Sequence, residues 1–205
     1  MRSPIRYGFM LVCALLLGLG ATAGRASAAG SPSDQIRGFY DVLLNNMKNA
    51  SALGVKGRYE KLEPVVRSAF DVPFMSRLSV GPLWGQLTAD QKKQVATAFG
   101  RYITATYASQ FDGYSGEQLK VLNEQQIKHG TLVRTQIVKS DGEPVSINYV
   151  LHDNDVSWQI RDIYLAGSIS QIATRRSEFS SILRGQGGVD KLISTLNDKA
   201  DALQH

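Results

Sequence analysis

The spacing of apolar residues divides the chain into a helical part, a strand-rich part and a second helical part. Between Asp34 and Phe111 apolar residues recur every three to four positions, which is typical of helices that bury one face. Pro64 is expected to kink or restart the second helix. Thr88 and Gln91 form a capping box at the start of the longest helix. The predicted helices are residues 33–50 (capped by Ser33 or Asp34), residues 57–70, a short helix opened by Asp71-Val72-Pro73, and residues 88–111.

The repeat of apolar residues changes from every 3.6 positions to every second position after Gly113 and Gly116, which predicts a change from helices to strands. Asp141-Gly142 is a typical hairpin turn, and the other links are also short, so we expect an antiparallel meander. Its four predicted strands are residues 118–126, 131–140, 144–152 and 156–165, and the two closing helices are residues 168–184 and 189–203. Helices packed on one face of a curved antiparallel sheet make an α+β fold of a single domain.

The first residues have the pattern of a secretory signal peptide. Two arginines precede an apolar run, residues 8–20, that is too short to span a bilayer comfortably. Ala26 and Ala28 are the small residues of an A-x-A cleavage site. We expect cleavage after Ala28, so that residues 1–28 are removed and residues 29–205 form one domain exported to the periplasm. The alternative is an uncleaved membrane anchor.

Composition and charge exclude several function classes. The chain has 205 residues, of which 43% are hydrophobic and 20% are charged, as in a globular protein rather than a disordered one. The formal net charge of +5 is too small to indicate nucleic-acid binding on its own. The single cysteine, Cys13, lies within the predicted signal peptide, so we expect neither a disulfide scaffold nor a multi-cysteine zinc site.

No sequence motif predicts catalysis, a metal or a cofactor. The chain contains no P-loop, no H-E-x-x-H motif and no G-x-S-x-G motif. The histidines His129, His152 and His205 lack the spacing of metal ligands and fit turns or the chain end. The glycines at 185–188 could bind an anion through free N–H groups, but a joint between two helices is the simpler interpretation. We therefore expect no catalytic residue, no metal and no cofactor.

Two charged residues fall where the pattern predicts buried side chains. Asp162 alternates with apolar and aromatic residues on one face of the last strand, and Arg176 interrupts the apolar stripe of the following helix. An unpaired buried charge is very costly, so we expect Asp162 and Arg176 to form an ion pair at the floor of the interior. Such a pair would either only stabilise the fold or also face a ligand.

The chain has many large apolar and tyrosine side chains that point, by periodicity, toward one interior. They form either an ordinary core or, in part, the wall of a cavity for an apolar ligand, and periodicity does not separate the two. The candidate cavity residues are Phe74, Met75, Leu78, Phe99, Tyr102, Ile103, Tyr107, Val133, Ile147, Tyr149, Trp158, Ile160, Tyr164 and Phe179.

Several segments, taken in order along the chain, resemble a known family. They are Phe70-Asp71-Val72-Pro73-Phe74-Met75, Pro144-Val145-Ser146-Ile147-Asn148-Tyr149, Trp158-Gln159-Ile160-Arg161-Asp162-Ile163, Arg176-Ser177-Glu178-Phe179 and Gly188-Val189-Asp190-Lys191-Leu192-Ile193. This ordered set is similar to the periplasmic lipid-shuttle family MlaC, also called toluene-tolerance auxiliary proteins. Other segments, such as Arg77-Leu78-Ser79-Val80-Gly81-Pro82, are more similar to the HpnM branch of that family, which is associated with hopanoid biosynthesis.

The resemblance implies both a fold and a function. The fold is an NTF2-like curved four-stranded antiparallel sheet with helices packed around an apolar cavity. The function is that of a non-enzymatic, monomeric carrier that holds a phospholipid or a hopanoid by its apolar part. The carrier would pass its lipid between inner-membrane and outer-membrane transport complexes. Basic residues at the mouth would meet the head group or an anionic membrane surface; the candidates are Arg134, Lys139 and Arg175, which could equally be solvated charges.

The residues themselves are also compatible with two other functions. NTF2-like cavities also host isomerases and dehydratases, in which an inward Asp acts as base, and Asp162 with Tyr164 or Tyr149 would fit these roles. Arg176 beside Asp162 would stabilise the charged carboxylate and make it a poor base. The other alternative is an adaptor of a membrane lipid transporter, which would have a solid interior.

Overall fold

The structure is a computed structural model that describes residues 30–205. The predicted signal peptide, residues 1–28, lies outside this range. All predicted helices are present, and most of their ends lie within a few residues of the prediction, but the second helix begins at Ala50, seven residues before the predicted start. The helices are α1 (Pro32–Lys48), α2 (Ala50–Ala69), α3 (Val72–Val80), the 3₁₀-helix η1 (Gly81–Gln86), α4 (Ala89–Gln110), α5 (Gln171–Arg184) and α6 (Gly188–Ala202).

The strands form one antiparallel sheet in the order β1-β2-β3-β4-β5. The predicted meander of four strands is confirmed, and a fifth strand of two residues is added at its edge. This fifth strand pairs Tyr164 with Ser170, so the chain folds back on the sheet before α5 begins. The strands are β1 (Gln118–Ile127), β2 (Gly130–Val138), β3 (Pro144–Asp153), β4 (Trp158–Leu165) and β5 (Ile169–Ser170).

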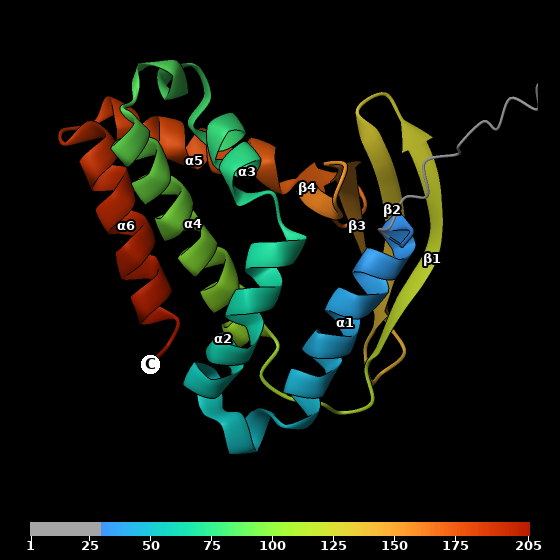
Figure 1. The fold of residues 1–205 in the computed structure, drawn as a ribbon. Coiled ribbons are helices and arrows are strands. Elements are labelled where there is room, and N and C mark those ends of the chain that lie inside the picture. The colour runs from blue at the N-terminus through green and yellow to red at the C-terminus, as the bar shows by residue number, and fades with distance from the viewer. Residues whose placement is uncertain (1–29) are drawn as a thin grey trace, which may run out of the picture.

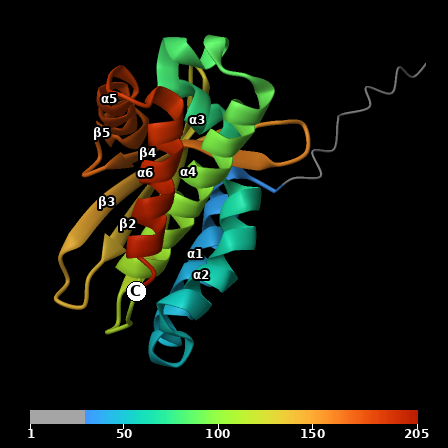
Figure 2. The ribbon, with the colours of Figure 1, turned by 90° about the vertical axis from the view of Figure 1, so that its left-hand side faces the viewer.

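The helices lie against one face of the sheet (Figure 1). Of these helices, α1 packs on β1 and β2, and α4 packs between α2 and α6 (Figures 1 and 2). Helix α6 covers the side of α4 that is turned away from the sheet, while α3 and α5 contact each other at one end of the helical layer. Within residues 30–205, no helix has the length and apolar character needed to cross a membrane.

The start of α1 differs from the prediction. Ser31 is the cap: its hydroxyl accepts from the Asp34 N–H (3.1 Å), and the Asp34 carboxylate accepts from the Ser31 N–H (3.0 Å). The expected cap at Ser33 or Asp34 is therefore wrong. Pro32 already occupies a helical position, because its fixed φ suits the first turn. The Ser33 hydroxyl instead donates to the Glu124 carboxylate of β1 (2.8 Å), which fixes α1 on the sheet.

The N-terminal caps of α3 and α4 agree with the sequence prediction, whereas the position of the break in α2 does not. The capping box of Thr88 and Gln91 is confirmed at α4, and Asp71 caps α3 by accepting from a backbone N–H (3.1 Å). The helix does not restart at Pro64. The residue with non-helical angles is Gly54, at φ 60°, a conformation that glycine adopts without a steric penalty.

A β-bulge decides which side chains of β4 face the helices. The pairing of β4 with β3 shifts by one residue between Ile160 and Asp162, so Arg161 is an extra residue in the strand. The Arg161 guanidinium donates to the Asp71 carboxylate (2.8 Å), and the Asp71 N–H donates to the Ile160 carbonyl (2.9 Å). The connection between α2 and α3 thus lies along the edge of β4 and meets the bulge there.

The bulge corrects the predicted face of this strand. We expected Trp158, Ile160, Asp162 and Tyr164 to share the inner face. Beyond the extra residue the alternation is inverted, so Ile163 is the inward residue, opposite the buried Tyr149. Asp162 and Tyr164 turn to the outer face of the sheet.

Candidate functional site

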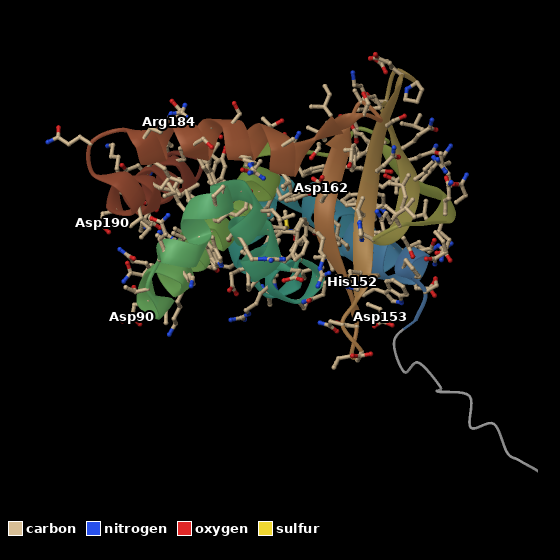
Figure 3. All side chains as sticks on the ribbon, turned by 90° about the horizontal axis from the view of Figure 1, so that it is seen from above. Asp90, His152, Asp153, Asp162, Arg184 and Asp190 are labelled. Atoms are coloured by element: carbon tan, nitrogen blue, oxygen red, sulfur yellow. The ribbon has the colours of Figure 1, made fainter. Side chains whose placement is uncertain are left out.

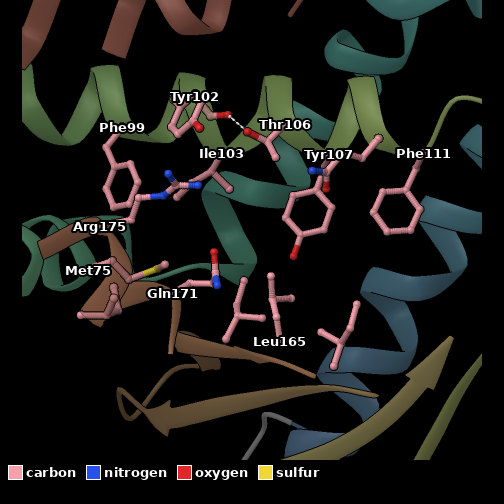
Figure 4. A pocket seen from close by; sticks show the side chains of 14 residues that line it. Met75, Phe99, Tyr102, Ile103, Thr106, Tyr107, Phe111, Leu165, Gln171 and Arg175 are labelled. Atoms are coloured by element: carbon pink, nitrogen blue, oxygen red, sulfur yellow. Dashed lines mark hydrogen bonds between the residues drawn. The ribbon is translucent and has the colours of Figure 1, made fainter. Parts of the chain in front are cut away.

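A partly enclosed hollow lies between α4 and the inner face of the sheet, and we call it the α4–sheet cavity (Figure 4). Its volume is about 150 Å³. Helix α4 forms one wall and strands β3 and β4 form the other, with α3 and α5 at one end. The lining residues are Met75, Phe99, Tyr102, Ile103, Thr106, Tyr107, Gln110, Phe111, Ile147, Ile163, Leu165, Gln171, Ile172 and Arg175.

The α4–sheet cavity extends along α4. Its lining residues on this helix and its C-cap run from Phe99 to Phe111 at the spacing of one helix face. With a rise of 1.5 Å per residue, this wall is about 18 Å long. The residues are mostly apolar, so the cavity is a trough for an elongated apolar group.

The structure brings part of the predicted cavity wall together. The predicted residues that line the α4–sheet cavity are Met75, Phe99, Tyr102, Ile103, Tyr107 and Ile147. Sequence reasoning did not include Ile163 and Leu165, because it did not foresee the bulge at Arg161. Thr106 and Phe111 were not predicted either, although they share one helical face with Phe99, Tyr102 and Ile103, and this spacing is the signal that could have found them. Gln171 and Ile172 follow β5, the strand that the sequence did not predict.

Four predicted wall residues belong instead to the solid core or to its edge. Val133, Tyr149 and Ile160 are at most 1% exposed, and they pack under α1 and α2 on the inner face of the sheet. Phe179 packs edge-on against Phe99, with ring centroids 5.3 Å apart, and so supports the cavity wall from behind. None of the four lines the α4–sheet cavity.

The remaining predicted wall residues also lie elsewhere. The Phe74 ring is covered by Arg161, whose guanidinium carbon is 4.2 Å from the ring centroid. Leu78 packs at the edge of the core without lining the cavity. Trp158 lines a separate hollow beside the start of α1, and Tyr164 is on the outer face of the sheet.

The end of the cavity near Phe111 is aromatic. The Tyr107 ring packs edge-on against Phe39 (5.2 Å) and stacks on Phe111 (5.7 Å). Burial raises the pKa of the Tyr107 and Tyr149 hydroxyls well above the usual value of 10, and it also raises the pKa of Tyr40. These hydroxyls are therefore neutral, and this end of the cavity carries no charge.

The end near Phe99 is charged at its rim. The Arg175 guanidinium pairs with the Glu178 carboxylate (2.8 Å) and lies 5.0 Å from the centroid of the Tyr102 ring. Lys199 of α6 pairs with the same carboxylate. Partial burial raises the pKa of Glu178, but the bonds from Lys199 and Arg175 outweigh burial and lower it overall.

The predicted ion pair between Asp162 and Arg176 is not formed within residues 30–205. Figure 3 shows Asp162 on β4 beside the start of α5. Its carboxylate accepts from the Ser170 hydroxyl (2.6 Å) and from the Ile172 N–H (3.1 Å), so it caps this helix. The Arg176 guanidinium lies against Gly81, where an added Cβ would come within 3.2 Å of it. The bulge is the reason, because it places Asp162 on the outer face.

Of the basic residues proposed for the mouth, Arg175 alone lines the α4–sheet cavity in the described chain. Arg134 is on the outer face of the sheet, where it donates to Asn123 (3.3 Å) and Gln125 (2.8 Å). Lys139 pairs with Glu143 across the turn between β2 and β3 (2.6 Å). Neither residue lines the α4–sheet cavity.

A larger groove lies on the other side of α4, against α2 and α3. Its volume is about 690 Å³, and charged side chains stand along its walls, among them Arg67, Asp71, Lys92, Lys93 and Arg101. An apolar ligand would leave these charges desolvated, which is costly, so the α4–sheet cavity is the better site for it. No group of three or more metal-ligating side chains occurs in residues 30–205.

These features define a class: an α+β binding protein in which helices and an antiparallel sheet enclose an apolar cavity. The family model described as MlaC protein matches residues 38–198. The chain therefore belongs to the MlaC family.

A comparison with solved structures supports the fold. The phospholipid-binding protein from Ralstonia solanacearum, solved in complex with a phospholipid, superposes with a TM-score of 0.75. The match covers 86% of this chain and 100% of the Ralstonia chain at 18% sequence identity. The comparison with curated proteins finds no match.

Proposed function

We propose that this protein is a non-enzymatic carrier that binds a lipid in the α4–sheet cavity and moves it between membranes. The observation that carries the proposal is the apolar trough along α4 in a protein of the MlaC family. The Ralstonia neighbour, which has the same fold, was solved with a phospholipid, and this supports a lipid as the ligand here.

The dimensions of the trough fit a lipid tail. Its wall is about 18 Å long. One leaflet of a bilayer has a hydrocarbon thickness of about 15 Å, half of the whole core. Each buried CH₂ group contributes about 0.8 kcal/mol, so apolar contact alone retains a lipid without covalent chemistry.

The volume of the trough implies that its walls move apart on binding. A cavity of about 150 Å³ is similar to engineered cavities that hold a single benzene ring. A complete lipid tail needs more room. Met75, which lies in the wall, has a flexible unbranched side chain that can adopt other rotamers. Lipid uptake is therefore expected to expand the space between α4 and the sheet.

A phospholipid is the ligand we favour, with a hopanoid as the alternative. The phospholipid follows from the Ralstonia neighbour. The hopanoid follows from the sequence resemblance to the HpnM branch. A rigid polycyclic lipid cannot bend, so it would need a wider opening between α4 and the sheet than a flexible tail.

The location and partners of the carrier are part of the proposal. We propose that residues 1–28 are a signal peptide and that residues 29–205 act as one domain in the periplasm. There the protein would receive lipid from one membrane complex and deliver it to another in the opposite membrane. The enzyme alternative is weakened because its proposed base, Asp162, caps α5 on the outer face of the sheet.

Native mass spectrometry tests the carrier. Residues 29–205 are purified from the periplasm of a hopanoid-producing host, and lipids are extracted from the same sample. A stoichiometric phospholipid or hopanoid supports the proposal and identifies the ligand. A protein that carries no lipid, and takes none from vesicles of phosphatidylethanolamine and phosphatidylglycerol, would favour an adaptor instead.

A further inference from the structure

Arg175 is the only charged side chain among the described residues that line the α4–sheet cavity. It extends from α5 toward α4 and lies near Phe99 and Ile103 (Figure 4). Its side chain is 22% exposed, so it is at the rim where the cavity meets solvent. Gln171, one helical turn earlier, lines the same rim and adds an uncharged hydrogen-bond donor.

The partners of Arg175 leave its charge available for exchange. Glu178 is bound by Arg175 and also by Lys199 from α6. If Arg175 moves away, Lys199 still neutralises the Glu178 carboxylate. The Tyr102 ring lies beside both cations, with its centroid 5.0 Å from the Arg175 guanidinium carbon and 5.7 Å from the Lys199 amine. This ring provides a surface that keeps the guanidinium oriented.

The start of α5 does not compete for an anion at this rim. Its Ile172 N–H is bound by the Asp162 carboxylate (3.1 Å), and its Ala173 N–H is bound by the Ser170 hydroxyl (3.0 Å). Those N–H groups, which would otherwise attract an anion, are occupied. Arg175 is therefore the group on α5 that can recognise negative charge beside the cavity.

We propose that Arg175 binds the anionic phosphate of a lipid head group at the rim of the α4–sheet cavity, in exchange for Glu178. The inference rests on the proposed function, since it assigns the head-group end of the same lipid site. A guanidinium donates two parallel hydrogen bonds to a phosphate, with stronger geometric selectivity than a lysine amine. An uncharged polycyclic lipid would gain nothing from this contact, so the site selects for an anionic acyl lipid.

The exchange predicts opposite effects at neighbouring residues. Arg175→Gln removes the phosphate contact and lowers the preference for an anionic lipid. Glu178→Gln removes the competing carboxylate and raises that preference. Lys199→Gln leaves Glu178 with Arg175 as its remaining cation, holds Arg175 more firmly and lowers the preference. A purely structural network would not give changes of opposite sign.

A competition between two lipids with identical tails measures this preference. Residues 29–205 are incubated with equal amounts of dioleoyl phosphatidylglycerol and dioleoylglycerol in a neutral, phosphate-free detergent. Native mass spectrometry then gives the ratio of the two bound lipids. Arg175→Gln is expected to lower the ratio about tenfold, or about 1.4 kcal/mol. Arg134→Gln removes an equal charge from the outer face of the sheet and is expected to leave the ratio unchanged.

The outcomes separate this inference from the carrier function. If the Arg175→Gln protein carries both lipids in the wild-type ratio, Arg175 does not read the head group, and the carrier function stands. If the wild-type protein binds neither lipid, this inference and the phospholipid as ligand are both overturned, and lipid extraction from the periplasmic protein then decides whether it carries a hopanoid instead. Should Arg175→Gln fold poorly, a Glu178→Gln ratio that does not rise would overturn the inference. Calorimetry with inorganic phosphate is expected to give no heat, and saturable binding that Arg175→Gln abolishes would instead indicate a site for free phosphate.

Discussion

The two ends of the α4–sheet cavity are built from different chemistry. At the end near Phe111, Tyr107 packs among buried aromatic rings and carries no charge. At the end near Phe99, Arg175 and Glu178 form a half-buried ion pair that solvent reaches. If Arg175 reads the head group as proposed, the residues that stabilise the fold and the residue that selects the ligand lie at opposite ends of one trough. The aromatic end is continuous with the core, whereas the charged end can exchange partners without disturbing the core.

The largest expected effect is at the aromatic end. Phe39 is 1% exposed and packs against Phe70, Tyr107 and Tyr149, with centroids 5.4, 5.2 and 6.4 Å away. Phe39→Ala removes these contacts and leaves a cavity, so the free energy of unfolding should fall by about 3–5 kcal/mol. Urea denaturation measures the change. The matched control is Phe74→Ala, because the Phe74 ring lies outside the core. Equal losses of unfolding free energy in the two variants would contradict the assignment of Phe39, but not Phe74, to the core.

The next effect concerns the space between the two ends. Ile163 is 8% exposed and lines the cavity from β4, so Ile163→Trp would fill the trough with an indole. Bound lipid in the purified protein should fall at least tenfold, while overpacking costs about 1–3 kcal/mol of stability. Lipid extraction from equal amounts of folded protein checks this. Leu122→Trp, at a residue that is 50% exposed on β1, serves as the control and should carry lipid as the wild type does.

Alkaline pH provides a third test, again at the aromatic end. The pKa values of Tyr40, Tyr107 and Tyr149 are raised in the folded protein, mainly by burial. Because each hydroxyl has a higher pKa in the folded than in the unfolded chain, it contributes its full share of stability below the unfolded pKa of about 10. This contribution is lost as the pH rises from there toward the folded pKa. Each such tyrosine should lower the free energy of unfolding by about 1.4 kcal/mol per pH unit in this range.

Urea denaturation at several pH values above 10 measures this slope. Tyr107→Phe removes one of the raised hydroxyls and should make the decline shallower. A decline of the same steepness in the variant and the wild type would show that the Tyr107 hydroxyl ionises as easily in the folded chain as in the unfolded one.

The smallest expected effect is at Phe74, which the sequence placed in the cavity wall. In the structure its ring lies under the Arg161 guanidinium, on the outside of α3. Phe74→Ala is therefore expected to leave the amount of bound lipid unchanged, as measured by lipid extraction. A loss of lipid comparable with that of Ile163→Trp would return Phe74 to the ligand site and contradict the position of the trough.

Much of the architecture could be predicted because its signals are local. The capping box at Thr88 and Gln91 and the stripe from Phe99 to Phe111 depend on residues within a few turns of each other. The hairpin at Asp141-Gly142 is equally local. Consequently the helices, the four main strands and one wall of the α4–sheet cavity followed from the sequence.

The other wall could not be predicted in the same way. Alternation along β4 is a correct guide from Trp158 to Ile160, and it fails after Arg161 because the strand contains an extra residue there. The side chain of that extra residue, Arg161, pairs with Asp71, which lies ninety positions away in the chain. A periodicity argument contains no information about such a contact.

The sequence by itself determined the order of the elements, which helix faces are apolar, and the family to which the chain is similar. The tertiary structure decided which aromatic residues fill the core and which border a hollow, and it moved Asp162 from the interior to the cap of α5. It also singled out Arg175 from three basic candidates. The physical reason is that periodicity predicts only which side of a single helix or strand is buried. A cavity lies between elements, so its walls depend on how strands and helices pack against one another across the whole chain.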